Sequence, residues 1–252
     1  MTTTDALTIA KPAGVALASL PEYLRNKVGN QAGLENVGQE DVLIPRLCIA
    51  QAMSPEVTKG DPKHIKGLLP GEFFNSVTQE KYGERVIVVP LFFFHQFLEF
   101  IPKEQGGGVA ASYSRREDVP AGDLDFKDGE KPVVTEFKNE MCLRIDPQTG
   151  AMTPVVVSFK SSGLKMAKKW NSLMRGTNLP AYARSYVLEI TTEKNTKGTW
   201  YGANVTPDTF VPESFFAAAE KYFNDLRQSG VKVDTTGLGE EAGIPEDADV
   251  KF

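Results

Sequence analysis

The segment Arg85–Phe100 constrains the fold more than any other part of the sequence. Val86 and Val88 are β-branched and Phe92–Phe94 are three consecutive aromatic residues, the types that strands favour. Its apolar run, Val86–Phe94, is interrupted by Pro90 and is far shorter than the roughly 18 residues that cross a bilayer. The segment therefore predicts a long, buried strand in a β-rich protein.

Further strand patterns lie on both sides of this segment. They are Asp41–Gln51 (broken at Pro45), Phe73–Val77, Val133–Ile145, Val155–Phe159, Tyr182–Thr192 and Gly198–Val205. The turns Asp146–Gly150 and Glu193–Gly198 predict two hairpins. The polar segment from Gly106 to Lys131 predicts a mobile loop.

Three segments have helical patterns: Leu20–Val28, Gly163–Arg175 and a last one from Pro212 to about Gln228. Meandering strands with one helix between them are typical of a small barrel of the oligonucleotide-binding (OB) kind. The fold class expected is mainly β with added helices (α+β). It would be an OB-like small barrel elaborated by long loops, the inserted helix and the C-terminal helix.

The charge pattern divides the chain into three parts. We expect a flexible N-terminal arm at residues 1–19, a folded domain at 20–232 and a disordered acidic tail at 233–252. The tail holds six acidic residues against Lys251 alone, so it carries the −5 net charge of the whole chain. The remainder is charge-balanced, and the acidic average does not argue against a nucleic-acid partner.

Basic and aromatic residues are interleaved between Val155 and Trp200. Candidate phosphate contacts are Lys160, Lys165, Lys168, Lys169, Arg175 and Arg184, and candidate base-stacking platforms are Trp170, Tyr186, Trp200 and Tyr201. Cations follow a phosphate backbone and aromatic faces stack on unpaired bases, so this mixture suits single strands. The alternative is an amphipathic helix with solvated lysines and Trp170 packed beneath, since strand aromatics are more often core.

The tail has two possible roles besides solubility. An acidic segment can occupy a cationic groove as a phosphate mimic, and the terminal aromatic residue can dock in a partner protein. The predicted partner-binding residues are Asp247, Asp249 and Phe252. A purely solubilising terminus is the alternative, although it would not require Phe252.

Several segments carry a resemblance to a known family. Three segments look like parts of uncharacterised or DNA-replication-associated phage proteins: LIPRLCIAQAMSPEV (Leu43–Val57), PGEFFNSVT (Pro70–Thr78) and PVVVSFKSSGLKMAKKWNSLMR (Pro154–Arg175). With its acidic tail ending in Phe252, the chain resembles phage-type single-stranded-DNA-binding proteins. That resemblance implies an OB fold, DNA coating, and recruitment of replication or recombination proteins through the tail. Bacterial members end in Pro-Phe, whereas this chain ends Asp249-Val250-Lys251-Phe252.

Two other classes remain open. Asp123 or Asp125 followed by Glu136-x-Lys138 echoes the acidic residues and lysine of a magnesium-dependent nuclease. A structural, adaptor or inhibitor protein of a phage, without DNA binding, is also compatible with a β-rich body.

Other chemistry has little support in the sequence. Candidate ligands for zinc (His64, His95, Cys48 and Cys142) lack the required spacing, and Gly106–Gly108 lacks the Gly-Lys-Ser/Thr continuation of a phosphate-binding loop. No catalytic residue, metal or cofactor is predicted. Two distant cysteines and a start without a secretory signal predict buried thiols in a cytoplasmic protein, in the host cytoplasm if phage-encoded. A homo-oligomer is compatible with the sequence.

Overall fold

The computed structural model describes residues 21–25, 32–33, 35, 43–102, 105–126, 132–195 and 198–229. The expected N-terminal arm and acidic tail lie outside these residues. The helices are α1 (Glu22–Arg25), α2 (Leu164–Arg175) and α3 (Glu213–Ser229), with short 3-10 turns η3 (Pro55–Val57), η5 (Arg116–Asp118), η6 (Ser161–Gly163) and η7 (Ala181–Ala183). The strands are β1 (Leu47–Ile49), β2 (Phe73–Asn75), β3 (Lys81–Gly83), β4 (Arg85–Phe100), β5 (Val109–Tyr113), β6 (Val134–Ile145), β7 (Met152–Phe159), β8 (Arg184–Asn195) and β9 (Gly198–Phe210).

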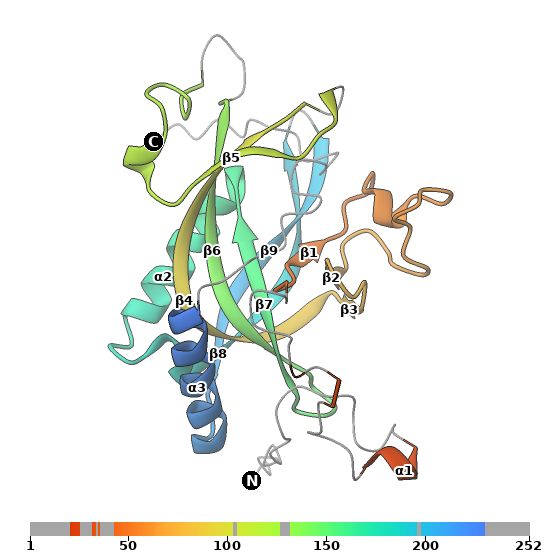
Figure 1. Cartoon of the computed structure of the whole chain (residues 1–252), viewed down its shortest axis with the longest axis vertical. Coiled ribbons are helices and arrows are strands. Elements are labelled where there is room, and N and C mark those ends of the chain that lie inside the picture. Colours follow the sequence, from red (N-terminus) through yellow and green to blue (C-terminus); the bar gives the residue numbers. More distant parts are fainter. Residues whose placement is uncertain are drawn as a thin grey trace.

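The main sheet is antiparallel and is built around β4. Its strand order is β7-β6-β4-β8-β9, and β5 pairs with the end of β4. β6 follows β4 from Ile87 to Glu99, whereas β8 pairs only with residues 85–88 and β5 only with 97–100. The sheet is strongly bent, with the second half of β4 rising beside β6 toward β5 (Figure 1).

A small sheet, β1-β2-β3, connects the two edges of the main sheet. At one edge Arg46 forms an isolated parallel bridge with Val156 of β7. At the other edge the Gln51 side chain donates from Nε2 to the Tyr201 carbonyl and accepts at Oε1 from the Tyr201 N–H, both at 2.9 Å. The edges are therefore linked through residues 46–51 rather than by a strand ladder, and the expected small barrel is not closed.

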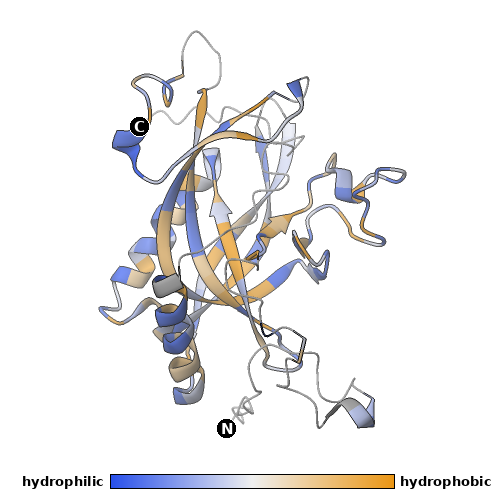
Figure 2. Cartoon of the chain, in the orientation of Figure 1, coloured by the Kyte–Doolittle hydropathy of each residue, from blue (hydrophilic) through white to orange (hydrophobic). Residues whose placement is uncertain are grey.

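The two faces of the main sheet pack against different layers. Because side chains alternate along β4, Val86 and Val88 point to one face and Val89 to the other. The first face packs against α2 and the small sheet through Trp170, Leu47 and Phe73. The second packs against α3, and Figure 2 shows that both helices carry hydrophilic as well as hydrophobic residues.

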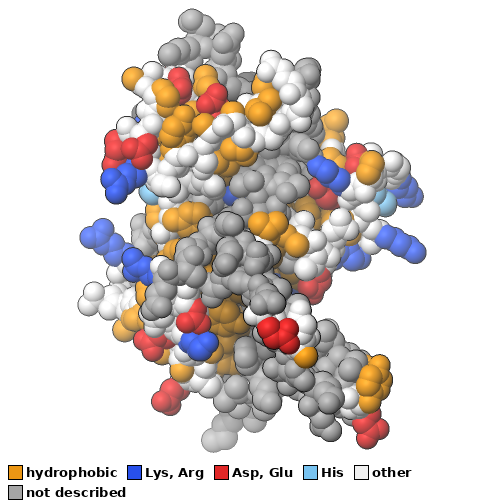
Figure 3. Space-filling view, viewed as in Figure 1, with side chains coloured by type: hydrophobic (Ala, Val, Ile, Leu, Met, Phe, Trp, Pro, Cys, Tyr) orange, Lys and Arg blue, Asp and Glu red, His pale blue; other side chains and the backbone are white. Residues whose placement is uncertain are grey.

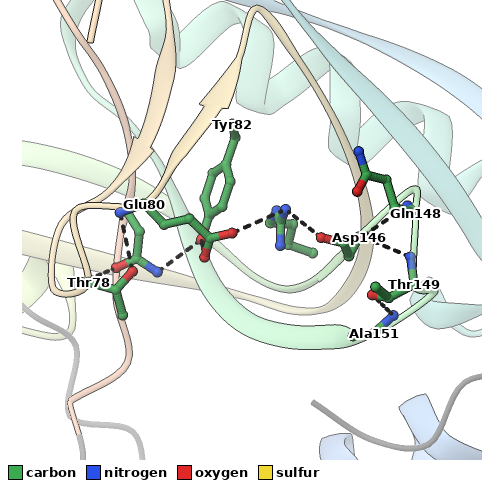
Figure 4. Close-up of polar contacts among 9 residues, drawn as sticks. Thr78, Glu80, Tyr82, Asp146, Gln148, Thr149 and Ala151 are labelled. Atoms are coloured by element: carbon green, nitrogen blue, oxygen red, sulfur yellow. Dashed lines mark hydrogen bonds and ion pairs between the residues drawn. The ribbon is translucent and has the colours of Figure 1, made fainter. Parts of the chain in front are cut away.

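Arg144 fixes the small sheet to the β6–β7 hairpin. Its guanidinium lies 3.8 Å from the centre of the Tyr82 ring, 3.3 Å from Asp146 Oδ2 and 3.8 Å from Glu80 Oε1. Figure 4 shows these contacts together with the turn in which Asp146 accepts from the N–H groups of Gln148 and Thr149. These N–H groups and Arg144 hold the pKa of Asp146 below its usual value, against the opposing effect of burial.

The expected class, mainly β with added helices, is confirmed, and β4 has the predicted bounds. Both hairpins and both long helices form, although β9 extends five residues beyond the predicted end. The expectation of a loop throughout 106–131 is wrong, since Val109–Tyr113 adds a strand to β4. Cys142 is fully buried, as predicted, whereas Cys48 is only half-buried, and neither forms a disulfide. None of the helices within the described ranges is long and apolar enough to cross a membrane.

Candidate nucleic-acid interface

Helix α2 separates its cationic and aromatic residues onto different sides. Lys165, Lys168, Lys169 and Arg175 are exposed, whereas Ala167 and Trp170 are fully buried. The helix contains no acidic residue. Lys169 Nζ donates to Asn204 Oδ1 of β9 at 3.0 Å, which holds one ammonium at the junction of α2 and β9. Cationic side chains gather over α2 on the left of Figure 3.

The prediction that bases stack on Trp170, Tyr186 and Trp200 needs correction, because the structure buries these side chains. Their side chains are 0%, 1% and 5% exposed. The Trp170 ring packs edge-on to Phe159 and at 5.6 Å from the Tyr186 ring, inside the core beneath α2. The large aromatic surfaces fill this core because they bury the most apolar area there, and no base can reach them in this conformation.

Tyr201, the fourth predicted platform, is half-buried at the junction with the small sheet. Its backbone pairs with Gln51, and a side chain at Gly71 would place Cβ 3.0 Å from the Tyr201 ring. Gly71 has a φ of +84°, so glycine serves both the backbone conformation and this close approach. Tyr201 thus helps to hold β9 against the segment that carries the small sheet.

The other predicted phosphate contacts, Lys160 and Arg184, lie apart from the α2 cations and beside aromatic rings. Lys160 Nζ is 5.9 Å from the centre of the Phe137 ring. Arg184 lies over the Phe210 ring at 5.2 Å and donates to the Asp208 carbonyl at 3.0 Å. Of the predicted residues, the structure brings together only the exposed α2 cations as one surface. Asp247, Asp249 and Phe252 lie outside the described residues.

A row of aromatic rings on β4 was not predicted as a site. Phe93, His95 and Phe97 project from one face of the strand at a spacing of two residues. The His95 ring lies 4.8 Å from the Phe93 ring, nearly perpendicular to it, and 5.9 Å from the Phe97 ring, nearly parallel to it. We call Phe93, His95 and Phe97 the aromatic row. In the sequence, the signal for it is the spacing of two residues between these rings within the predicted strand Arg85–Phe100.

Glu136 of β6 lies beside the aromatic row and contacts three basic side chains. Its carboxylate is 3.7 Å from His95 Nδ1, 3.6 Å from Lys138 Nζ and 4.0 Å from Arg116 Nη1. Glu136 and Lys138 therefore do share a face, as the nuclease pattern requires. However, the described residues contain no group of three His, Cys, Asp or Glu side chains arranged to hold a metal.

One comparison with known proteins gives a match. The sequence model of the family described as Pam3 phage gp34-like protein matches residues 13–232. No curated protein and no solved structure matches the chain.

Proposed function

The chain belongs to the Pam3 phage gp34-like protein family, and from this premise we propose that it is a bacteriophage protein that binds single-stranded DNA without sequence preference. It would protect single strands during DNA replication or recombination. Its acidic tail would recruit partner proteins through Asp247, Asp249 and Phe252.

The strand order supports an OB-like core for this role. If β4, β6, β7, β8 and β9 are counted as strands 1 to 5 and β5 is left out, the main sheet has the order 3-2-1-4-5. In the sequence, α2 then lies between the third and fourth of these strands. An OB barrel has five strands, is partly open and binds oligonucleotides on its surface. In this chain the third and fifth strands would be separated by residues 46–51, which link the two edges.

The cationic side of α2 is the observation that carries the proposal. Four basic side chains lie on twelve residues without an acid to neutralise them within the helix. Exposed cations of this kind release counterions from a phosphate backbone, and the gain does not depend on base sequence.

The test compares oligo-dT with duplex DNA of the same length by fluorescence anisotropy at several salt concentrations. For the triple variant Lys165→Gln/Lys168→Gln/Lys169→Gln we expect weaker binding to oligo-dT. The slope of log K against log salt should also fall by about 2, given roughly 0.7 per phosphate contact for single strands. The control Lys59→Gln/Lys66→Gln/Lys221→Gln removes the same charge from exposed sites elsewhere.

Two outcomes would favour the alternatives. A wild-type protein without salt-sensitive, single-strand-selective binding would contradict the proposal and leave a structural or adaptor role. The contact of Glu136 with Lys138 favours a nuclease as the second candidate. Magnesium-dependent cleavage that is lost in Glu136→Ala would support the nuclease instead.

A further inference from the structure

The aromatic row has no structural role that explains all of its members. Phe92, Phe94, Phe97 and Phe100 of β4 each pack in or against a hydrophobic cluster. Phe93 belongs to none of these clusters, and it is only partly buried. The His95 side chain, next in the row, is 43% exposed. Phe97 is buried and supports the row from below, in a cluster with Val119 and Val134.

Basic side chains accompany the exposed part of the row. Lys138 is directly opposite His95 in the register of β4 and β6. Arg116, on η5, is 66% exposed and reaches the same carboxylate as His95 and Lys138. Glu136 thus holds two cations beside the rings, Arg116, which is 66% exposed, and Lys138, which is 13% exposed. This arrangement places donors for phosphate oxygens next to surfaces suited to bases.

The η5 turn beside the row carries Arg116 together with the acidic residues Glu117 and Asp118. At the upper left of Figure 3, basic side chains lie next to acidic ones.

We propose that Phe93 and His95 form the base-stacking subsite of this chain and that its ligand is single-stranded DNA. This inference rests on the proposed function and replaces the buried tryptophans with the exposed His95 ring and the partly buried Phe93 ring. One base stacks on the surface formed by the two rings, while Lys138 and Arg116 contact the neighbouring phosphates. Glu136 is a positioning residue that orients these cations.

Affinity for oligo-dT tests the subsite. Phe93→Ala and His95→Ala should each weaken binding by roughly tenfold, within the range measured when stacking residues are removed. His95→Phe keeps a ring and should bind within about twofold of wild type, which a charge contact from His95 would not allow. Tyr23→Ala removes an aromatic side chain that is 74% exposed on α1 and should bind like wild type.

The two histidines of the chain give a readout that is independent of stability. In a proton NMR titration with oligo-dT, the ring signals of His95 should shift upfield because a stacked base adds its ring current. Signals of His64, between η3 and β2, should stay in place.

The two proposals can fail separately. If wild type binds oligo-dT and the α2 triple variant weakens it, but the row variants bind normally and His95 does not shift, the subsite is overturned alone. If wild type does not bind, the proposed function is contradicted and the subsite with it. Thermal unfolding of each variant identifies losses of affinity that come from misfolding. For such variants, the shift of the His95 signals in wild type decides whether the subsite exists.

Discussion

At the scale of single residues, Glu140 is an unusual feature of the core. It lies on β6 on the same face as Cys142, and neither carboxylate oxygen has a hydrogen-bond partner among the described residues. Burial raises the pKa of Glu140 to about 8 and that of the Cys142 thiol well above its usual value. The carboxyl group is therefore neutral in the folded protein at pH 7, which lowers the cost of burying it.

This protonation makes stability depend on pH in a defined direction. The unfolded carboxyl loses its proton near pH 4.5, whereas the folded one keeps it to about pH 8. Between these values the folded state binds more protons, so the free energy of unfolding falls as pH rises, by up to about 1.4 kcal/mol per pH unit.

Glu140→Gln removes the titrating group and keeps the shape of the side chain. Relative to wild type, we expect the variant to gain stability steadily from pH 5 to pH 8, as measured by urea unfolding. Glu189→Gln, at an exposed position on β8, serves as the control. Parallel pH profiles for wild type and Glu140→Gln would contradict the assignment.

At the scale of elements, the strands could be predicted because local patterns determine them. Arg85–Phe100 has a long run of β-branched and aromatic residues, and the hairpin turns are marked by Asp-Pro and Gly. β5 has the sequence VAASY, which is too short and too poor in large apolar residues to be recognised before it pairs with β4. The direction in which Trp170 or Phe93 points depends on tertiary packing, so the choice of platform residues needed the structure.

The link between the small sheet and β9 is an element-scale contact that can be tested alone. Gln51→Ala leaves the N–H and C=O of Tyr201 without their partner, and a buried unpaired polar group costs about 1–3 kcal/mol. We expect the free energy of unfolding to fall by about 2 kcal/mol and the Tyr201 amide to exchange faster with solvent. Gln148→Ala, on the exposed hairpin turn, should change neither. Unchanged protection of Tyr201 would show that another contact holds the two sheets together.

At the scale of the whole molecule, charge is divided between a balanced body and an acidic tail. The cations of α2 and those near the aromatic row lie in the body, while the −5 net charge belongs to residues 233–252. Under the proposed function, we expect the attached acidic tail to compete with DNA for the cationic surface of the body. Such competition is electrostatic and is screened over about 10 Å at 0.1 M salt.

Deleting residues 237–252 separates the two proposed roles of the tail. We expect the truncated protein to bind oligo-dT several-fold more tightly than wild type at low salt, because the competing acids are gone. The difference should disappear at high salt, where the electrostatic attraction is screened. Phe252→Ala keeps all the acids, so it should leave DNA affinity unchanged while reducing capture of a replication or recombination protein. If truncation leaves affinity unchanged at low salt, the tail does not compete for the DNA surface, and the docking and solubilising roles are left to explain its acidic sequence.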